Sequence, residues 1–566
     1  MTPGLAGFIA SGRDETAWEP SVAGVIAALA AEFEVVPERG GQSVAAGRRT
    51  LLDTFDWRLH KAGLTLDYAA RSVGGELRLA DQAAAATEPV ITQPVTGWQA
   101  ARPHLMCEVP GGPVASRIGD LVVPRALLPV VAVTTATTVH RLLNEDGKTV
   151  ARLLVEQSTI GGQRSGSHVT RLAPRLAIAE VRGYPGQARR AVRLIGAASG
   201  IATAEEPAFA EALRALGRRP GDYSNKVDTS ITAAMPASRA AATILLRLLD
   251  TVDANVGGVL ADTDTEFLHD LRVSVRRTRS ALKLFGDVLL TVADGSAGPA
   301  GLTEEELAFF AAEFKWVGDL TTPTRDLDVH LLDFDDTAHA LSAAKPDDLE
   351  PFRTYLEQRR RREFRALTRG LKSARFTDLR SGWRARLTAI KDSNPAGGST
   401  TVRSGQRGQA AGGTTGTLAA ERTRTAFAKV ARRGAAITAE SPAESLHDLR
   451  KRCKELRYAL EFFAPLYERT AQAKVVGDLK RLQDCLGEFQ DTEVQIGEIR
   501  ALATAMLAAG EAPAVTLLAM GEVTAGLVSR QRAAREDFGR RFAAFAGIDG
   551  QRRMSALLRG KPGVGS

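Results

Sequence analysis

Cysteine and aromatic residues are scarce in this chain. Only three cysteines, Cys107, Cys453 and Cys485, occur among 566 residues. Their odd number and their spacing fit neither a disulfide framework nor a zinc site. Aromatic residues make up 5% of the chain, so there is little from which to build a surface that stacks nucleic-acid bases. We therefore expect a reducing, cytoplasmic setting, and nucleic acid is disfavoured as a partner.

Long apolar runs are also missing. ALLPVVAV, at 126–133, is among the longest, and a membrane span needs roughly 18 apolar residues. The opening MTPGLAGFIASGRDE lacks the basic start and long apolar stretch of a secretory signal. We expect neither a leader peptide nor a membrane partner.

What the chain does contain is typical of a soluble globular protein. Hydrophobic residues make up 44% and charged residues 25%. The length predicts two or three domains. Lys and Arg total 74 against 66 Asp and Glu, which gives a net charge of +8. An excess this small matters only if it is concentrated on one face.

The N-terminal part of the chain, 1–215, has the pattern of strands. Short β-type runs bounded by turn residues are GLTLDYAA, GELRLA, LLPVVAVTT, TVARLLVEQST and RLAIAEVRG. The segment 142–157, LLNEDGKTVARLLVEQ, predicts a hairpin with Asp-Gly at its turn. Helical pieces intervene at 21–33 and 187–199. We predict an α+β domain with an antiparallel sheet or barrel at 1–215, followed by a linker at 216–234.

From residue 235 the apolar residues recur at the three- and four-residue spacing of helices. A Gly, Ser and Thr-rich stretch at 393–416 interrupts the pattern and predicts a flexible linker. The remaining predicted segments are a first helical half at 235–392, a second helical half at 417–550 and a disordered tail at 551–566.

The two helical halves repeat a phrase. LHDLR occurs at 268–272 and again at 446–450, and basic residues follow it both times. Each half then has a second helix ending in acidic residues, RDLDV in the first and QDTEV in the second. The repetition predicts an internal duplication, with two helical bundles related by a pseudo-twofold axis.

Each LHDLR segment begins a ladder of cations. Positions i, i+3, i+7, i+10 and i+14 form one stripe of an α-helix. From His269 these offsets give Arg272, Arg276, Arg279 and Lys283. From His447 they give Arg450, Lys454 and Arg457, and the ladder ends at Glu461. We call these sets the first ladder and the second ladder.

The first ladder contains no acid between Asp270 and Asp287. Like charges at such spacings repel, so a solvated helix usually interleaves Glu with its Arg. An anionic ligand would supply the missing counter-charge, and the guanidinium fork of Arg suits phosphate. An ordinary solvated face is the alternative, but its repetition at matching offsets favours a binding surface.

Catalytic and metal sites are not predicted in the helical half. Neither His269 nor His447 has a His or Cys at i+4, and no nucleophile accompanies them. The chain has no GxxxxGK[ST] and no HExxH motif. Arg325, before Asp326 and Asp328, fits either a ligand contact or a local salt bridge. We therefore expect no cofactor and no metal.

These motifs resemble those of the CHAD domain, the conserved histidine α-helical domain. The segments HDLRVSVRRTRSALKLF, RDLDV and HDLRKRCKELRYALEFF carry the resemblance over roughly 235–550. It implies a duplicated helical bundle whose basic cavity binds inorganic polyphosphate, and an association with polyphosphate granules. The residues it implies for binding are those of the two ladders, with His269 and His447 marking the motif. Arg325 fits the basic position of the family's RD-D element, where the second half has Gln490.

The N-terminal region resembles the CYTH family, named for adenylate cyclases and thiamine triphosphatases. LLDTFDWRLHKAGLTL, at 51–66, and AEVRGYPGQ, at 179–187, carry this resemblance. It implies an antiparallel β-tunnel in which acids hold a divalent metal while Lys and Arg grip a triphosphate.

The residues of that chemistry are largely replaced here. Glu32 and Glu34 have the spacing of the family's ExExK strand, but Val36 stands where Lys belongs. After GLTL, Asp67 and Ala69 stand in place of R-x-R. In the later basic strand, Thr137 and Thr138 stand in place of cations. The acidic strand keeps a single acid, Glu180. We predict a CYTH-like fold without catalysis.

Three functions remain from the sequence. The first is a non-enzymatic protein that binds polyphosphate through the two ladders and Arg325. The second is a metal-dependent triphosphatase or cyclase in the N-terminal domain. The third is a nucleic-acid-binding protein that uses the same basic surface.

Overall fold

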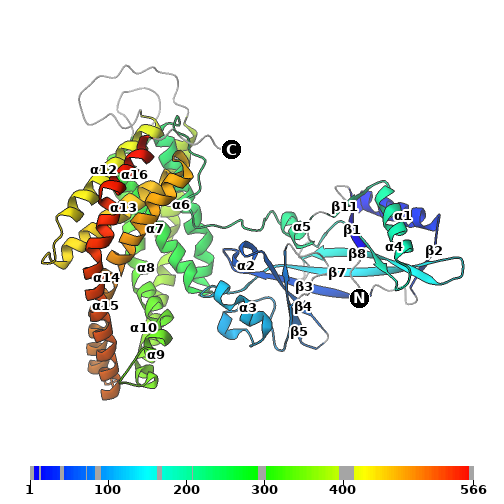
Figure 1. The fold of residues 1–566 in the computed structure, drawn as a ribbon, viewed down its shortest axis with the longest axis horizontal. Coiled ribbons are helices and arrows are strands. Elements are labelled where there is room, and N and C mark those ends of the chain that lie inside the picture. The colour runs from blue at the N-terminus through cyan, green and yellow to red at the C-terminus, as the bar shows by residue number, and fades with distance from the viewer. Residues whose placement is uncertain are drawn as a thin grey trace. The chain divides into compact units, whose positions relative to one another are not determined.

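The computed structural model describes residues 5–11, 15–38, 44–71, 73–82, 91–161, 169–204, 206, 208–290, 301–393 and 413–559. The chain divides into two compact units, Met1–Ser224 and Asn225–Ser566 (Figure 1). The division falls inside the segment 216–234 that the sequence marks as a linker.

The N-terminal unit is built, in its described residues, on one antiparallel sheet. Its strands are β1 (Leu5–Ala10), β2 (Glu34–Pro37), β3 (Val44–Asp53), β4 (Leu64–Ala70), β5 (Gly75–Asp81), β6 (Ile91–Val95), β7 (Leu128–Leu143), β8 (Thr149–Ile160), β9 (Thr170–Arg171), β10 (Arg175–Glu180) and β11 (Ile201–Thr203). They follow the order β11-β1-β10-β8-β7-β3-β4-β5-β6, with β2 on β7 and β9 on β8. The predicted α+β class is confirmed.

The predicted hairpin is the centre of this sheet. β7 and β8 pair antiparallel, from Val133 opposite Ile160 to Leu143 opposite Thr149. The turn has Gly147 at φ 73°, a left-handed value that favours glycine. The side-chain oxygen of Asn144 accepts the N–H of Lys148 at 2.9 Å and closes the turn. The Asp-Gly signal was therefore sufficient to place this element.

Helices accompany the sheet. Those in the described part of this unit are α1 (Glu15–Ala30), α2 (Arg58–Lys61), α3 (Pro113–Val122), α4 (Pro185–Ala197) and α5 (Ala208–Ala215). Ala188, Ala191 and Ile195 of α4 lie fully buried in one core with strand residues. Phe209, Ala212 and Leu213 of α5 pack in another core. Both helices are thus held by their apolar faces.

The regular secondary structure described in the C-terminal unit consists of helices. The first half contains α6 (Ala237–Leu260), α7 (Thr265–Phe285), η2 (Gly286–Leu289), α8 (Glu304–Leu332), α9 (Phe334–His339), η3 (Pro346–Leu349), α10 (Glu350–Leu371) and α11 (Ala374–Asp392). The second half contains α12 (Thr415–Ala435), α13 (Ala443–Phe462), η4 (Ala464–Leu466), α14 (Arg469–Ala509), α15 (Ala514–Ala546) and α16 (Ile548–Arg559). The predicted all-α class of this region is confirmed.

One predicted boundary was wrong. The sequence placed a disordered tail at 551–566, but residues 551–559 belong to α16. Met554 and Leu557 are buried there, so this helix has an apolar face that a tail would lack. Residues 560–566, and 394–412 of the predicted linker, lie outside the described residues.

The two halves are arranged about a pseudo-twofold axis. Pro236 and Thr414 form an antiparallel bridge, and the interval between them in the chain equals that between the two LHDLR phrases. The N–H of Ala237 donates to Gly413 at 3.0 Å, and the N–H of Thr415 donates to Met235 at 2.8 Å. Equivalent residues of the two repeats thus contact each other reciprocally where α6 and α12 begin.

The ends of the two motif helices meet in the same way. Phe285 of α7 is fully buried, with its ring 5.8 Å from that of Phe463, its equivalent in the second repeat. Phe462 lies at 5.7 Å in a T-shaped contact with Phe285. This aromatic cluster, Phe285, Phe462 and Phe463, fixes α7 beside α13 by apolar burial.

Candidate functional site

Helices α7 and α13 carry the two ladders, and they lie side by side in the C-terminal unit (Figure 1). The Nε of Arg276, on α7, donates to the hydroxyl of Tyr458, on α13, at 2.9 Å. One residue further, Arg277 forms an ion pair with Glu461 at 3.0 Å. The ladders are therefore drawn together rather than spread over opposite faces of the bundle.

Arg276 and Lys454 occupy equivalent positions of the two ladders, and each feels the charge of the other. Burial lowers the pKa of Lys454 to about 8, and the nearby charges of Arg450, Arg276 and Arg457 contribute to that shift. A lysine with so low a pKa lies half-buried among like charges. This cluster of Arg276 with the second ladder is the centre of the candidate site.

Arg272 extends the cluster toward α8. Its guanidinium donates to the hydroxyls of Thr321 at 3.0 Å and Thr322 at 2.8 Å, and to the carbonyl of Gly318 at 3.3 Å. Burial lowers the pKa of Arg272, and although Asp326 opposes this shift, the repulsion of Arg276 and Arg325 adds to it. Arg272 is thus oriented by neutral oxygen atoms, and Asp326 offsets its charge only from a distance, without an ion pair.

No cation of the first ladder forms an ion pair within the part of the chain that the structure describes. This holds for Arg272, Arg276, Arg279 and Lys283. Arg279 lies against α8, where a Cβ on Gly318 would come within 3.1 Å of its guanidinium. Its charge helps to lower the pKa of Asp319, although the hydrogen bond from Lys315 is the main cause of that shift. Lys283 is exposed near the end of α7, apart from the other three.

The second ladder differs, because acids from α13 and α14 meet most of it. Glu493 lies 2.7 Å from the Nε2 of His447, and Asp491 lies 2.9 Å from Arg450. Glu461 lies 2.6 Å from Arg457. Only Lys454 has no carboxylate partner among the described residues of this set. The sequence already predicted a shorter second ladder, ending at Glu461, and the structure adds acids from α14 beside His447 and Arg450.

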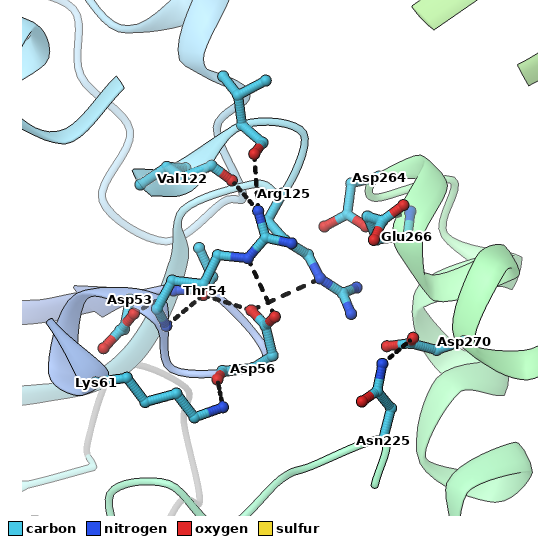
Figure 2. A network of polar contacts seen from close by, with 12 residues as sticks. Asp53, Thr54, Asp56, Lys61, Val122, Arg125, Asn225, Asp264, Glu266 and Asp270 are labelled. Atoms are coloured by element: carbon cyan, nitrogen blue, oxygen red, sulfur yellow. Dashed lines mark hydrogen bonds and ion pairs between the residues drawn. The ribbon is translucent and has the colours of Figure 1, made fainter. Parts of the chain in front are cut away.

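Arg325 and His269 lie at the edge of the cluster. Arg325 donates to the carbonyl of Thr265 at 3.4 Å and lies 4.0 Å from Glu266. His269 is half-buried on α7, and the next residue, Asp270, is buried and accepts a hydrogen bond from Asn225 at 2.7 Å (Figure 2). The histidine and aspartate of the motif thus lie on the same helix as the cations of the first ladder.

Sequence reasoning missed four contributors to this site. Tyr458 gave no signal, because a tyrosine on an apolar face is indistinguishable from a core residue. Asp491 and Glu493 were visible only as the acidic end of a helix, and Thr321 as a polar residue before RDLDV. Which of them would meet a ladder depends on how the helices pack, and the sequence does not state that.

The N-terminal unit uses its motif acids for structure. Asp53 is buried and accepts the N–H groups of Thr54 at 2.7 Å, Leu59 at 3.0 Å and His60 at 2.9 Å. Its burial raises the pKa of Asp53 even though these hydrogen bonds oppose the shift. The loop passes through Trp57, which has a left-handed φ of 61°. Asp53 therefore stabilises a turn, and both of its carboxylate oxygens accept hydrogen bonds there.

Asp56 and Arg125 complete that loop (Figure 2). Asp56 lies 3.1 Å from Arg58 and 3.7 Å from Arg125, whose side chain is 1% exposed. The hydrogen bond from Thr54 and these two cations lower the pKa of Asp56 against the effect of its burial. The ion pair of Asp56 with the buried Arg125 helps to fix the segment 53–61.

The sheet residues compared with CYTH chemistry are also engaged. Asp67, which stands in the R-x-R position, accepts two hydrogen bonds from Arg49, at 2.8 and 2.5 Å. Arg175 of β10 pairs with Glu211 of α5 at 3.1 Å. Among the residues that the structure describes, no three His, Cys, Asp or Glu side chains are grouped to hold a metal ion.

No helix in the described ranges is both long enough and apolar enough to cross a bilayer. The three cysteines are free thiols, with Cys453 and Cys485 buried.

The C-terminal unit is thus a helical bundle whose two motif helices meet, and the cations of the first ladder form no ion pair among its described residues. Residues 243–500 match the family model described as the CHAD domain. No curated protein sequence matches the chain.

Three solved structures are similar to parts of the chain. The CHAD domain from the plant Ricinus communis is 24% identical, with a TM-score of 0.44, over 57% of this chain and 96% of that one. PptA from Streptomyces chartreusis is 16% identical, with a TM-score of 0.38, over 54% and 99%. A protein described as a candidate adenylate cyclase from Bacillus halodurans is 14% identical, with a TM-score of 0.21, over 34% and 90%. The CYTH-like assignment of the N-terminal unit rests on its sequence motifs.

Proposed function

We propose that this protein binds inorganic polyphosphate, without chemical conversion, at the contact of α7 and α13. The residues that would bind phosphates are Arg272, Arg276, Arg279, Arg450, Lys454 and Arg457, with Lys283 and Arg325 at the edges and His269 and His447 beside them. The observation that supports this most is the repulsion between Arg276 and Lys454 at equivalent positions. A chain of phosphates offers regularly spaced negative charge to such a row of cations.

A polyanion would relieve an existing electrostatic strain in the domain. The cations of the first ladder already repel one another and pay part of their dehydration cost in the free protein. Each phosphate contact would also release condensed counterions, as it does for nucleic acids. Binding should therefore weaken steeply as salt rises. Association with polyphosphate granules in the cytoplasm would follow from this function.

Binding is expected to take up a proton at Lys454. Its pKa is about 8 in the free protein, against an ordinary value of 10.5, and a bound anion favours the charged form. Affinity should therefore fall as pH rises above 8, by up to about tenfold per pH unit. Calorimetry at pH 8 in two buffers of different ionisation enthalpy should report an uptake of about half a proton per site.

The matched control is Lys454→Arg, which keeps the charge but removes this titration, because Arg stays protonated throughout the range. Its proton uptake at pH 8 should be near zero. An unchanged uptake in Lys454→Arg would show that another group titrates, and the role of Lys454 would be wrong.

In the absence of an anion, the low pKa of Lys454 makes the stability of the protein increase with pH. The unfolded chain binds more protons between pH 8 and 10.5, so the free energy of unfolding should rise across that window.

A metal-dependent triphosphatase in the N-terminal unit is the second candidate. Against it, Asp53 is committed to a turn and Asp67 to Arg49. We expect no release of phosphate from tripolyphosphate by the full chain with Mg²⁺ or Mn²⁺. Phosphate release that requires the metal and is lost in an Asp67→Asn variant would overturn this expectation.

Nucleic acid is the third candidate for the same cations. The motif helices offer few aromatic side chains for stacking bases, and Tyr458 is buried. Long polyphosphate should therefore displace single-stranded DNA from the protein at equal phosphate concentration. Displacement in the reverse direction would favour the nucleic-acid function.

A further inference from the structure

The two halves of the cluster present their cations differently. Arg272 is held by two hydroxyls and a carbonyl, all of them neutral. Its equivalent, Arg450, donates instead to both carboxylate oxygens of Asp491, at 2.9 and 3.2 Å, and to the side-chain oxygen of Gln490 at 3.2 Å. Asp326 acts on Arg272 through its charge but forms no ion pair with it, whereas Asp491 is bonded directly to Arg450.

Asp491 is placed where an incoming anion would approach. Its side chain is 64% exposed, whereas that of Arg450 is only 17% exposed. Its charge also acts on Lys454, where it opposes the repulsion of the arginines. Both carboxylate oxygens accept from one guanidinium nitrogen, Nη2 of Arg450, and an oxygen of a phosphate could accept a charge-assisted hydrogen bond from the same nitrogen. Asp491 therefore resembles a ligand supplied by the chain itself.

We propose that Asp491 is an internal competitor, which holds Arg450 in the free protein and must be displaced before the second half can bind phosphate. This inference rests on the proposed polyphosphate function and deepens it. An anion would first contact Arg272 and Arg276, which form no ion pair among the described residues. Only a chain long enough to reach α13 could then replace Asp491, because attachment at the first half raises its local concentration at the second. Asp491 would thus favour long chains over short anions.

The geometry makes displacement feasible. Asp491 is the exposed member of the pair, so solvent can take up its released carboxylate, and an anion that replaces it leaves the mostly buried Arg450 paired. Asp491 is on α14 and Arg450 on α13, and the contact joins two helices that are packed independently by buried residues such as Leu449, Cys453 and Leu486. Releasing the carboxylate requires a side-chain rotation and no movement of the backbone.

The test is the variant Asp491→Asn, which removes the charge but keeps the shape of the side chain. Affinities for tripolyphosphate and for long-chain polyphosphate would be measured by calorimetry at pH 6.5, where Lys454 is protonated in wild type and variant. We expect both anions to bind more tightly, by about fivefold for tripolyphosphate and less for the long chain. The preference for long chains should therefore shrink.

Two further variants make the result specific. Asp250→Asn removes the same charge from an exposed carboxylate, 51% exposed and paired with Arg384 at 2.7 Å on the outer helices α6 and α11. It should leave both affinities within about twofold of wild type. Gln490→Glu adds a second carboxylate beside Arg450, and it should weaken both anions.

The outcomes separate this inference from the function on which it rests. If wild-type protein binds neither anion, the polyphosphate function itself is wrong. If wild type binds but Asp491→Asn binds no more tightly, or gains no more than Asp250→Asn, the competitor role is wrong and the function stands. Tighter binding confined to Asp491→Asn, with weaker binding in Gln490→Glu, would establish the competitor.

Discussion

Replacing Arg272 and Arg276 together by alanine should weaken the binding of long polyphosphate by about a hundredfold or more. Each guanidinium would otherwise make charge-assisted hydrogen bonds to phosphate, worth about 1.5–3 kcal/mol apiece. Both side chains lack a carboxylate partner among the described residues, so no internal ion pair would offset the loss. Calorimetric titration or retardation of labelled polyphosphate in a gel would measure the change.

The fold should survive this double substitution. Arg272 donates to Thr321 and Thr322, but both hydroxyls also donate to backbone carbonyls of α8 and stay satisfied without it. Removing like charges from a half-buried cluster relieves repulsion. The melting temperature should therefore be unchanged or higher, as measured by circular dichroism in the far ultraviolet.

A matched pair of substitutions controls for lost net charge. Arg540 and Arg552 lie on α15 and α16 with side chains 77% and 78% exposed. Alanine at both positions removes two positive charges from helices that carry neither ladder. This change should alter the affinity by less than about threefold. If this control weakens binding as much as the ladder variant, the protein binds polyphosphate through its overall charge, and the site assigned to α7 and α13 is wrong.

The second large effect concerns the aromatic cluster that holds the ladders together. Phe285→Ala should cost about 3–5 kcal/mol of unfolding free energy, because it removes a fully buried ring and leaves a cavity. Its contacts with Phe462 and Phe463 join the two repeats, so the loss should be felt by both. The melting temperature of the helical unit should fall by about 5–10 °C in thermal unfolding followed by circular dichroism.

Phe309→Ala is the control for this second prediction. Phe309 lies on α8 with 56% of its side chain exposed, so its removal should cost about 1 kcal/mol or less. The Phe285→Ala variant should also lose affinity for polyphosphate, because α7 and α13 would no longer be held in register. A strongly destabilised variant that binds like wild type would indicate that the two ladders act separately.

The two predictions together describe a domain that combines apolar stabilisation with electrostatic strain. The aromatic cluster holds the two repeats together at the ends of α7 and α13, whereas the cations carried by these two helices repel one another. Arrangements that lower stability without an internal compensation are common at binding sites. The acids around the second ladder relieve part of this strain in the free protein, and Asp491 would exchange its place with the ligand.

Much of the fold was readable from local sequence. The hairpin of β7 and β8 followed from an Asp-Gly turn between β-branched runs, because turn geometry is set by neighbouring residues. The duplicated helices followed from a repeated phrase and a three- and four-residue apolar period, which needs no knowledge of tertiary contacts. The tail was misjudged, because Met554 and Leu557 become core residues only through packing on other helices.

The sequence by itself determined that two equivalent helices each carry a stripe of cations, since helical geometry fixes which side chains share a face. Only the tertiary structure decided that the charge of Arg276 acts on Lys454, that Arg276 donates to Tyr458, and that Asp491 pairs with Arg450. These contacts cross between different helices. Their charge balance depends on crossing geometry and burial, which arise only when the whole bundle packs.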